Sequence, residues 1–205
     1  MSFKTFRLDP WGDLTLRVGP DGEAEDYVVD PRALARASPV FERMLYGEFA
    51  EGNQSAREAV GGWTVRLPGD NPWTMGRFLS TMHGNYDESL ASLSIDEIYD
   101  LILVAHYYDA IKLLQSWAGA RLDHVKSLTE DVHAPALKML WVAWELGSVP
   151  LVHEICRCIV LEFDAADFAS ALCDASVQTP PGVLGKKYYS LCYNPSETWS
   201  INYWS

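Results

Sequence analysis

The stretch ALARASPVFERML, residues 33–45, places a Ser-Pro pair in the middle of a run that otherwise has helical character. Proline has no amide proton and clashes with the preceding helical turn, so it fits the start of a helix and not its interior. The hydroxyl of Ser38 can accept a hydrogen bond from a backbone amide at such a start. We therefore predict that one helix ends near Ala37 and that a second begins at Pro39.

The same combination of a cap residue and a proline occurs shortly before, at Asp30-Pro31. It predicts a first short helix that opens at Pro31 and runs directly into the second. Apolar residues of the second helix share one face at helical spacing, and they are Val40, Phe41, Met44 and Leu45. We expect two short helices, back to back, that bury this face in a core.

Three strands are predicted around the helix pair. Residues 13–18 alternate between apolar and polar side chains, which indicates a half-buried strand. The Gly-Pro-Asp-Gly turn at 19–22 then returns the chain as a second strand over 24–29. Residues 50–62 are polar and contain glycine, which predicts a loop, and alternation resumes in a third strand over 63–67.

The remainder of the chain has a helical pattern. Pro72 can open a helix that Gly84 ends, and Ser94 with Glu97 forms a capping box in front of a long apolar helix. Asp109 marks a break after that helix. Further helices are predicted over 111–122, 136–146 and 149–163, with a short one reaching residue 175.

Composition excludes several classes of function. The 205 residues are 48% hydrophobic and include eight tryptophans, which indicates a folded core. The net charge of −12 argues against a nucleic-acid partner and against an anionic membrane, because both need a basic face. No apolar run reaches the ~18 residues of a membrane-spanning helix. We expect a cytoplasmic or nuclear protein whose four cysteines are reduced.

No catalytic arrangement is found. The five histidines are scattered outside any metal-binding motif, and His106 lies in an apolar helix, which predicts a packed side chain. Cys156 and Cys158 have no second cysteine pair at zinc spacing. The sequence has neither a G-x-S-x-G motif nor a phosphate-binding loop. We therefore expect no enzyme, no cofactor and no metal.

An ordered set of short motifs carries a resemblance to a known family. In chain order they are Gly12-Asp13-Leu14, Ala33-Leu34, Ser38-Pro39-Val40-Phe41, Phe78-Leu79, Gly84-Asn85-Tyr86, Leu103-Val104-Ala105, Tyr108-Asp109 and Leu113-Leu114. With the predicted order of strands and helices, residues 12–122 resemble the BTB/POZ domain, in the style of its fungal members. The resemblance implies an α+β fold, a small β-sheet capped by α-helices, followed by an all-α extension.

The resemblance also implies which positions define the fold and where the domains end. The fold-motif positions are Asp13, Leu14, Asp30, Leu34, Ser38, Pro39, Phe41, Gly84, Tyr86, Ala105, Tyr108 and Asp109. Many family members have a histidine where Asp30 stands; aspartate also caps a helix, so the fold is expected to persist without any role of that histidine. The predicted regions are an N-terminal tail (1–11), the domain (12–122), a helical extension (123–177) and an aromatic-rich C-terminal tail (178–205).

The function implied is a non-catalytic protein–protein interaction module, a scaffold that mediates self-association, as in a homodimer, or recruits partners. One alternative is a substrate adaptor for a cullin-type ubiquitin ligase. An alternative of another class is an enzyme or small-ligand binder with a site between the domain and its extension.

Two sets of residues are candidate contact sites. Trp73, Met75 and Phe49 form a candidate partner interface, because ubiquitin-ligase adaptors of the family dock a cullin scaffold near this region. They do so with an apolar residue and an acidic residue two places on, and this chain has no carboxylate there. Phe3 and Phe6 form a candidate dimer segment, since some relatives exchange an N-terminal segment between protomers. Its short length favours a frayed tail instead.

Overall fold

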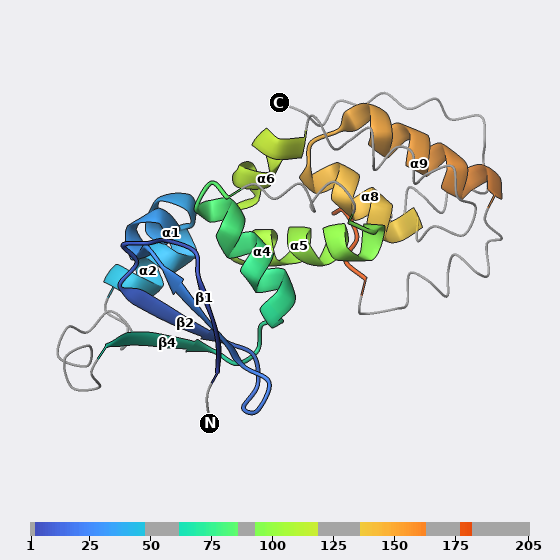
Figure 1. Cartoon of the computed structure of the whole chain (residues 1–205). Helices are drawn as coiled ribbons and strands as arrows, with labels where there is room; N and C mark the ends of the chain where they lie inside the picture. The colour runs from blue at the N-terminus through green and yellow to red at the C-terminus, as the bar shows by residue number, and fades with distance from the viewer. Residues whose placement is uncertain (1–2, 48–61, 86–92, 119–135, 163–176, 182–205) are drawn as a thin grey trace. The chain divides into compact units, whose positions relative to one another are not determined.

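The computed structural model describes residues 3–47, 62–85, 93–118, 136–162 and 177–181. The chain is α+β and divides into two compact units, Met1–Val125 and Lys126–Ser205 (Figure 1). The elements of the first unit are β1 (Lys4–Arg7), β2 (Leu14–Val18), β3 (Glu25–Val29), α1 (Pro31–Ala37), α2 (Pro39–Tyr46), β4 (Trp63–Leu67), α4 (Pro72–Met82), α5 (Ile95–Tyr107) and α6 (Ile111–Ala118).

The four strands form one sheet in the order β1-β3-β2-β4. The predicted hairpin is confirmed, since β2 and β3 pair antiparallel with Leu16 opposite Tyr27. The predicted third strand is β4, which pairs parallel with β2. Gly19 and Gly22 both have positive φ in the hairpin turn, at 101° and 102°, a conformation that glycine adopts without strain.

The N-terminal residues differ from the frayed tail that we expected. β1 pairs parallel with β3 at the edge of the sheet, and the amide of Leu8 continues the ladder to the carbonyl of Val28 at 2.9 Å. The ring of Phe6 stacks on Tyr27 with centroids 5.3 Å apart. A strand of four residues with one large apolar side chain is too short to give an alternation signal.

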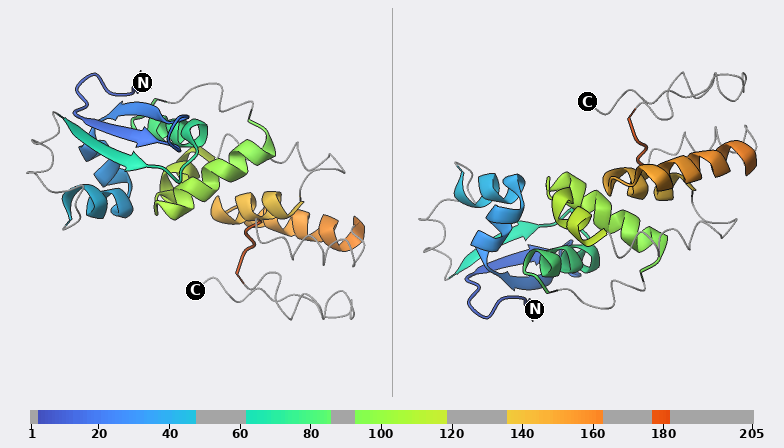
Figure 2. Two further views of the ribbon diagram at one scale, coloured as in Figure 1. Left: turned by 90° about the horizontal axis from the view of Figure 1, so that it is seen from below. Right: turned by 90° about the horizontal axis from the view of Figure 1, so that it is seen from above.

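One face of the sheet packs into the hydrophobic core of the first unit. Leu14, Leu16 and Val18 are fully buried, whereas Thr15 and Arg17, between them, are partly exposed. Each such buried side chain stabilises the fold by roughly 1.5–3 kcal/mol. Figures 1 and 2 show α1, α2 and α4 beside the sheet from three directions.

The helix starts follow the predicted caps. Asp30 caps α1, and Ser38 is both the C-cap of α1 and the N-cap of α2. The side chain of Asn71 accepts from the amide of Thr74 at the start of α4. The capping box at the start of α5 is present with both of its hydrogen bonds, and Asp109 ends that segment with φ of 51°. A left-handed residue at this point lets the chain turn directly into α6.

The described helices of the second unit are α8 (Ala136–Glu145) and α9 (Val149–Glu162), which pack against each other. Gly147, with φ of 74°, separates them as the sequence predicted. The buried apolar residues of these two helices include Leu140, Leu151, Ile155 and Ile159. Across the described parts of both units, no helix has the length and apolar character needed to cross a membrane.

Candidate protein-interaction surfaces

The joint between α1 and α2 brings three predicted fold-motif residues together. The fully buried Ser38 hydroxyl accepts from the amide of Phe41 at 3.1 Å and donates to the carbonyl oxygen of Tyr108 at the end of α5. The rings of Phe41 and Tyr108 stack with centroids 4.5 Å apart and 12° between their planes. The α1–α2 hairpin is therefore fastened to α5 by one polar and one aromatic contact.

Tyr108 extends this contact to the turn between β4 and α4. Its hydroxyl donates to Oδ2 of Asp70 at 2.8 Å. Burial raises the pKa of the Asp70 carboxyl above its usual range, and the hydrogen bond from Tyr108 opposes that shift. Burial and the adjacent Asp70 also raise the pKa of the Tyr108 phenol. The sequence analysis missed Asp70, because nothing in the local pattern links it to a residue so distant along the chain.

We expect Asp70→Asn to stabilise the protein at neutral pH. A raised carboxyl pKa in the folded state means that the stability linked to this group is fully present below its unfolded pKa, about 3.9, and is lost as the pH rises through the folded value. Asparagine keeps an oxygen acceptor for Tyr108 and carries no charge. The variant should be more stable than the wild type at pH 7, and this gain should shrink towards pH 4, where the Asp70 carboxyl of the wild type is increasingly protonated.

Thermal melts at several pH values measure this effect. The control is Asp13→Asn, which removes an exposed carboxyl that precedes β2. An equal gain in both variants would mean that the effect comes from net charge and not from the buried position of Asp70.

A histidine links α4 to the start of α1. Nε2 of His83 accepts from the backbone amide of Asp30 at 3.0 Å, and Nδ1 lies 2.8 Å from the carbonyl oxygen of Leu79. These partners assign the neutral tautomer with its proton on Nδ1. The Asp30 carboxylate in turn accepts from the amide of Arg32 at 2.9 Å. Asp30 therefore caps α1 as predicted. The imidazole that contacts the start of α1 is that of His83, at the end of α4.

The candidate partner interface is only partly exposed. Trp73 lies in the first turn of α4 with 42% of its surface exposed, and the Arg77 guanidinium lies 4.2 Å from the centre of its ring. The interpretation of Met75 as an interface residue is wrong, since Met75 is fully buried on the inner face of α4 beside Phe78. Helical spacing turns these two neighbouring apolar positions to opposite sides. Phe49 lies outside the described residues.

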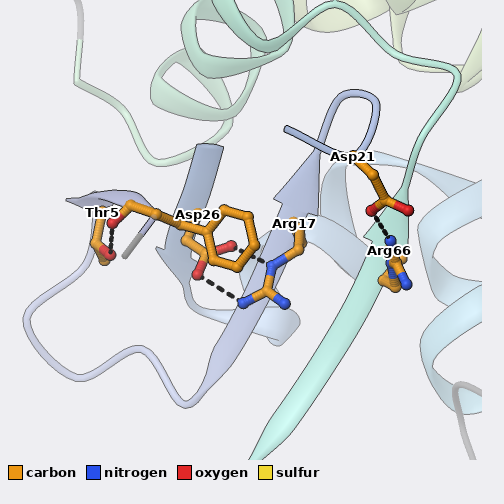
Figure 3. A network of polar contacts seen from close by, with 6 residues as sticks. Thr5, Arg17, Asp21, Asp26 and Arg66 are labelled. Carbon is orange, nitrogen blue, oxygen red and sulfur yellow. Dashed lines mark hydrogen bonds and ion pairs between the residues drawn. The ribbon is translucent and has the colours of Figure 1, made fainter. Parts of the chain in front are cut away.

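The candidate dimer segment makes contacts within its own sheet. Phe3 lies against the Arg17 guanidinium, 4.0 Å from ring centroid to Cζ. Arg17 also donates two hydrogen bonds to the carboxylate of Asp26, at 2.8 and 2.9 Å (Figure 3). This carboxylate raises the pKa of the Arg17 guanidinium. Phe6 faces the other side of the sheet, on Tyr27. Exchange of this segment between protomers stays a prediction.

Two further polar contacts lie near the Arg17–Asp26 pair, one an ion pair and one a hydrogen bond. Arg66 on β4 pairs with Asp21 in the β2–β3 turn, and Thr5 donates to the carbonyl of Phe3 (Figure 3). Both members of the Arg66–Asp21 pair are largely exposed, so their contribution to stability is small.

Three further side chains have an exposure that the sequence did not predict. His106 is exposed, so its interpretation as a packed residue is wrong; it lies on the outer side of α5, where apolar neighbours in sequence do not surround it. Trp11 and Tyr107 are 92% and 73% exposed, and isolated aromatic residues at element ends gave no pattern that predicts this. Both are candidate contact residues for a partner.

The described cysteine residues both lie on α9. Cys156 and Cys158 are free thiols, and burial raises the pKa of Cys156 to about 11. A thiol with this pKa is protonated at neutral pH and reacts slowly. Within the described ranges, histidine, cysteine and carboxylate side chains form no group of three that could hold a metal ion.

The other fold-motif positions differ in their burial. Leu14, Leu34 and Ala105 are fully buried, whereas Pro39 is exposed at the first turn of α2. Gly84 has φ of 72°, which ends α4, and Tyr86 lies outside the described residues.

The chain matches no family model and no curated protein sequence.

Proposed function

We propose that the chain is a BTB/POZ-type module for protein–protein interaction, without catalytic activity, that associates with itself or recruits protein partners. The element order carries the proposal: β2 and β3, the α1–α2 pair, β4, α4, and then α5 and α6. This is the order that the sequence resemblance implies. The Ser38–Tyr108 bond supports it, since it accounts for a Ser-Pro joint that must keep its register.

The exposed side chains support a binding role. Trp73 on α4 and Tyr107 at the end of α5 are exposed aromatic side chains, and the half-buried Arg77 lies against the ring of Trp73. Aromatic and arginine residues dominate the energetics of protein interfaces. A module of this kind needs such anchors on a rigid scaffold, and all three belong to helices of the first unit.

Light scattering on the full chain tests the proposal. The purified chain is measured alone and then mixed with the N-terminal domain of the third cullin. A dimer or larger species, or a complex with the cullin at micromolar concentration, supports the interaction module. A monomer that forms no complex contradicts self-association and removes the present basis for the proposal.

The mixed sample also separates the cullin adaptor from a self-associating scaffold. If a complex forms, Trp73→Ala should weaken it by roughly ten-fold or more, because a central aromatic anchor contributes about 1.4 kcal/mol or more. Tyr46→Ala is the matched control, since it removes a ring that is exposed to a similar extent, 49%, on α2 and has no proposed binding role. Equal weakening by both variants would argue against docking at α4, where the acidic residue of adaptors is missing.

A further inference from the structure

The α1–α2 hairpin exposes a local group of arginines in an acidic protein. Arg32 and Arg36 are both exposed on α1, and Arg43 is exposed on α2. Arg32 and Arg36 are four residues apart, so their side chains project from one face of the helix. We call this pair of residues the α1 arginine pair. The chain as a whole has a net charge of −12.

These arginines differ from three of the four cations on the strands; the fourth, Arg7, donates to the carbonyl oxygen of Pro10. Lys4, Arg17 and Arg66 each lie against a carboxylate. In contrast, none of the carboxylates in the described part of the chain lies within ion-pair distance of the α1 arginine pair or of Arg43. Their guanidinium groups are available to an external anion.

The position of Arg32 is unfavourable for the helix that carries it. Arg32 lies in the first turn of α1, which contains no acidic residue, and a cation there opposes the helix dipole. Arg36, in the last turn, has the favourable placement. Stabilisation of the helix therefore accounts for an arginine at position 36 and does not account for one at position 32.

We propose that the exposed face of α1, through Arg32 and Arg36, docks an acidic segment of a protein partner. The inference rests on the proposed function as an interaction module and names the chemistry of its partner. Each guanidinium can bind a carboxylate through two parallel hydrogen bonds, and the spacing on the helix presents two such forks side by side.

Charge favours a short acidic peptide over a nucleic acid. Salt screens charges beyond about 8–10 Å at physiological ionic strength, so a short segment responds mainly to the arginines that it touches. A nucleic acid is a longer polyanion whose binding needs many phosphate contacts and a broad basic face, and the net charge of −12 opposes it.

Fluorescence anisotropy of the full chain with a labelled ten-residue glutamate peptide tests the inference at an ionic strength of about 0.15 M, where charges more than about 8 Å from the peptide are screened. The double variant Arg32→Gln/Arg36→Gln should lose roughly ten-fold or more in affinity. The matched control, Arg66→Gln/Lys112→Gln, changes the net charge by the same amount at exposed positions outside the hairpin and should retain the wild-type affinity.

A second readout separates binding from structure. Arg32→Gln alone should weaken peptide binding while leaving the melting temperature unchanged or higher, because it removes the first-turn cation. Weakened binding together with a lower melting temperature would overturn the inference, as would an equal loss of affinity in the two double variants. Binding of a labelled ten-nucleotide thymidine strand more tightly than the peptide would also overturn it.

Failure of the inference and failure of the proposed function give different results. If light scattering shows self-association or a protein complex while the peptide does not bind, the module remains and the α1 site is refuted. If the peptide binds through the α1 arginine pair while the chain is a monomer without a cullin complex, self-association is refuted and the acidic-partner site is supported.

Discussion

Replacing Phe41 with alanine is expected to lower the free energy of unfolding by about 3–5 kcal/mol, the usual cost of deleting a buried aromatic side chain. Phe41 is fully buried, and its ring stacks on Tyr108 at a centroid distance of 4.5 Å. The variant loses that stack and leaves a cavity between α2 and the end of α5. Because small domains are stable by only about 5–15 kcal/mol, the loss should be visible in urea unfolding as a large fall in the midpoint.

The control for Phe41→Ala is Glu42→Ala, the next residue of the same helix, which is exposed. Its loss should stay below about 1 kcal/mol, the value of a carboxylate in the first turn of a helix. Phe41→Leu should fall between the two, since leucine refills part of the cavity. A loss below about 1 kcal/mol for Phe41→Ala would mean that α2 does not pack in this way.

Replacing Ser38 with alanine is expected to cost about 2–4 kcal/mol, the sum of a lost helix cap and a buried carbonyl left without its donor. The Ser38 hydroxyl caps α2 through the amide of Phe41 and also donates to the carbonyl of Tyr108. The side chain is fully buried, so the carbonyl oxygen of Tyr108 that it bonds to has no direct access to bulk solvent. Urea unfolding with an unchanged m-value gives the difference directly.

Ser94→Ala provides the matched control for Ser38→Ala. Ser94 also caps a helix by accepting from an amide, that of Glu97, but it is exposed and has no partner on another element among its described hydrogen bonds. Its replacement should cost only the cap, about 1 kcal/mol. If the two variants lose equal stability, the bond from Ser38 to Tyr108 contributes nothing and the fastening of the hairpin must come from the aromatic stack.

The local plan of the first unit was predictable because it depends on residues close in sequence. Proline fixes the backbone and aspartate or serine caps the helix in front of it, so the starts of α1 and α2 followed from Asp30-Pro31 and Ser38-Pro39. The alternation in β2 and β4 was likewise visible within five residues, and the Gly-Pro-Asp-Gly turn at 19–22 predicted β3 as the returning strand.

The errors concern properties that depend on distant residues. Whether Met75 or Trp73 faces outward is set by the sheet against which α4 packs, and the sequence does not state that direction. β1 becomes a strand because β3 offers a free edge, not because KTFR has a strong pattern. The Asp70–Tyr108 bond joins the β4–α4 turn to the end of α5, and neither local sequence predicts the other.

The bond from Ser38 to Tyr108 spans 70 residues of chain, and this separation bears on how the protein folds. α1 and α2 have seven and eight residues, shorter than the ~12–15 residues at which an isolated helix becomes marginally stable in water. Neither helix is therefore expected to be stable alone, and the bond to Tyr108 can form only after the chain has closed a long loop. Closing such a loop costs entropy before any contact compensates for it, which slows folding. The hairpin that exposes the α1 arginine pair should thus reach its final packing late in folding.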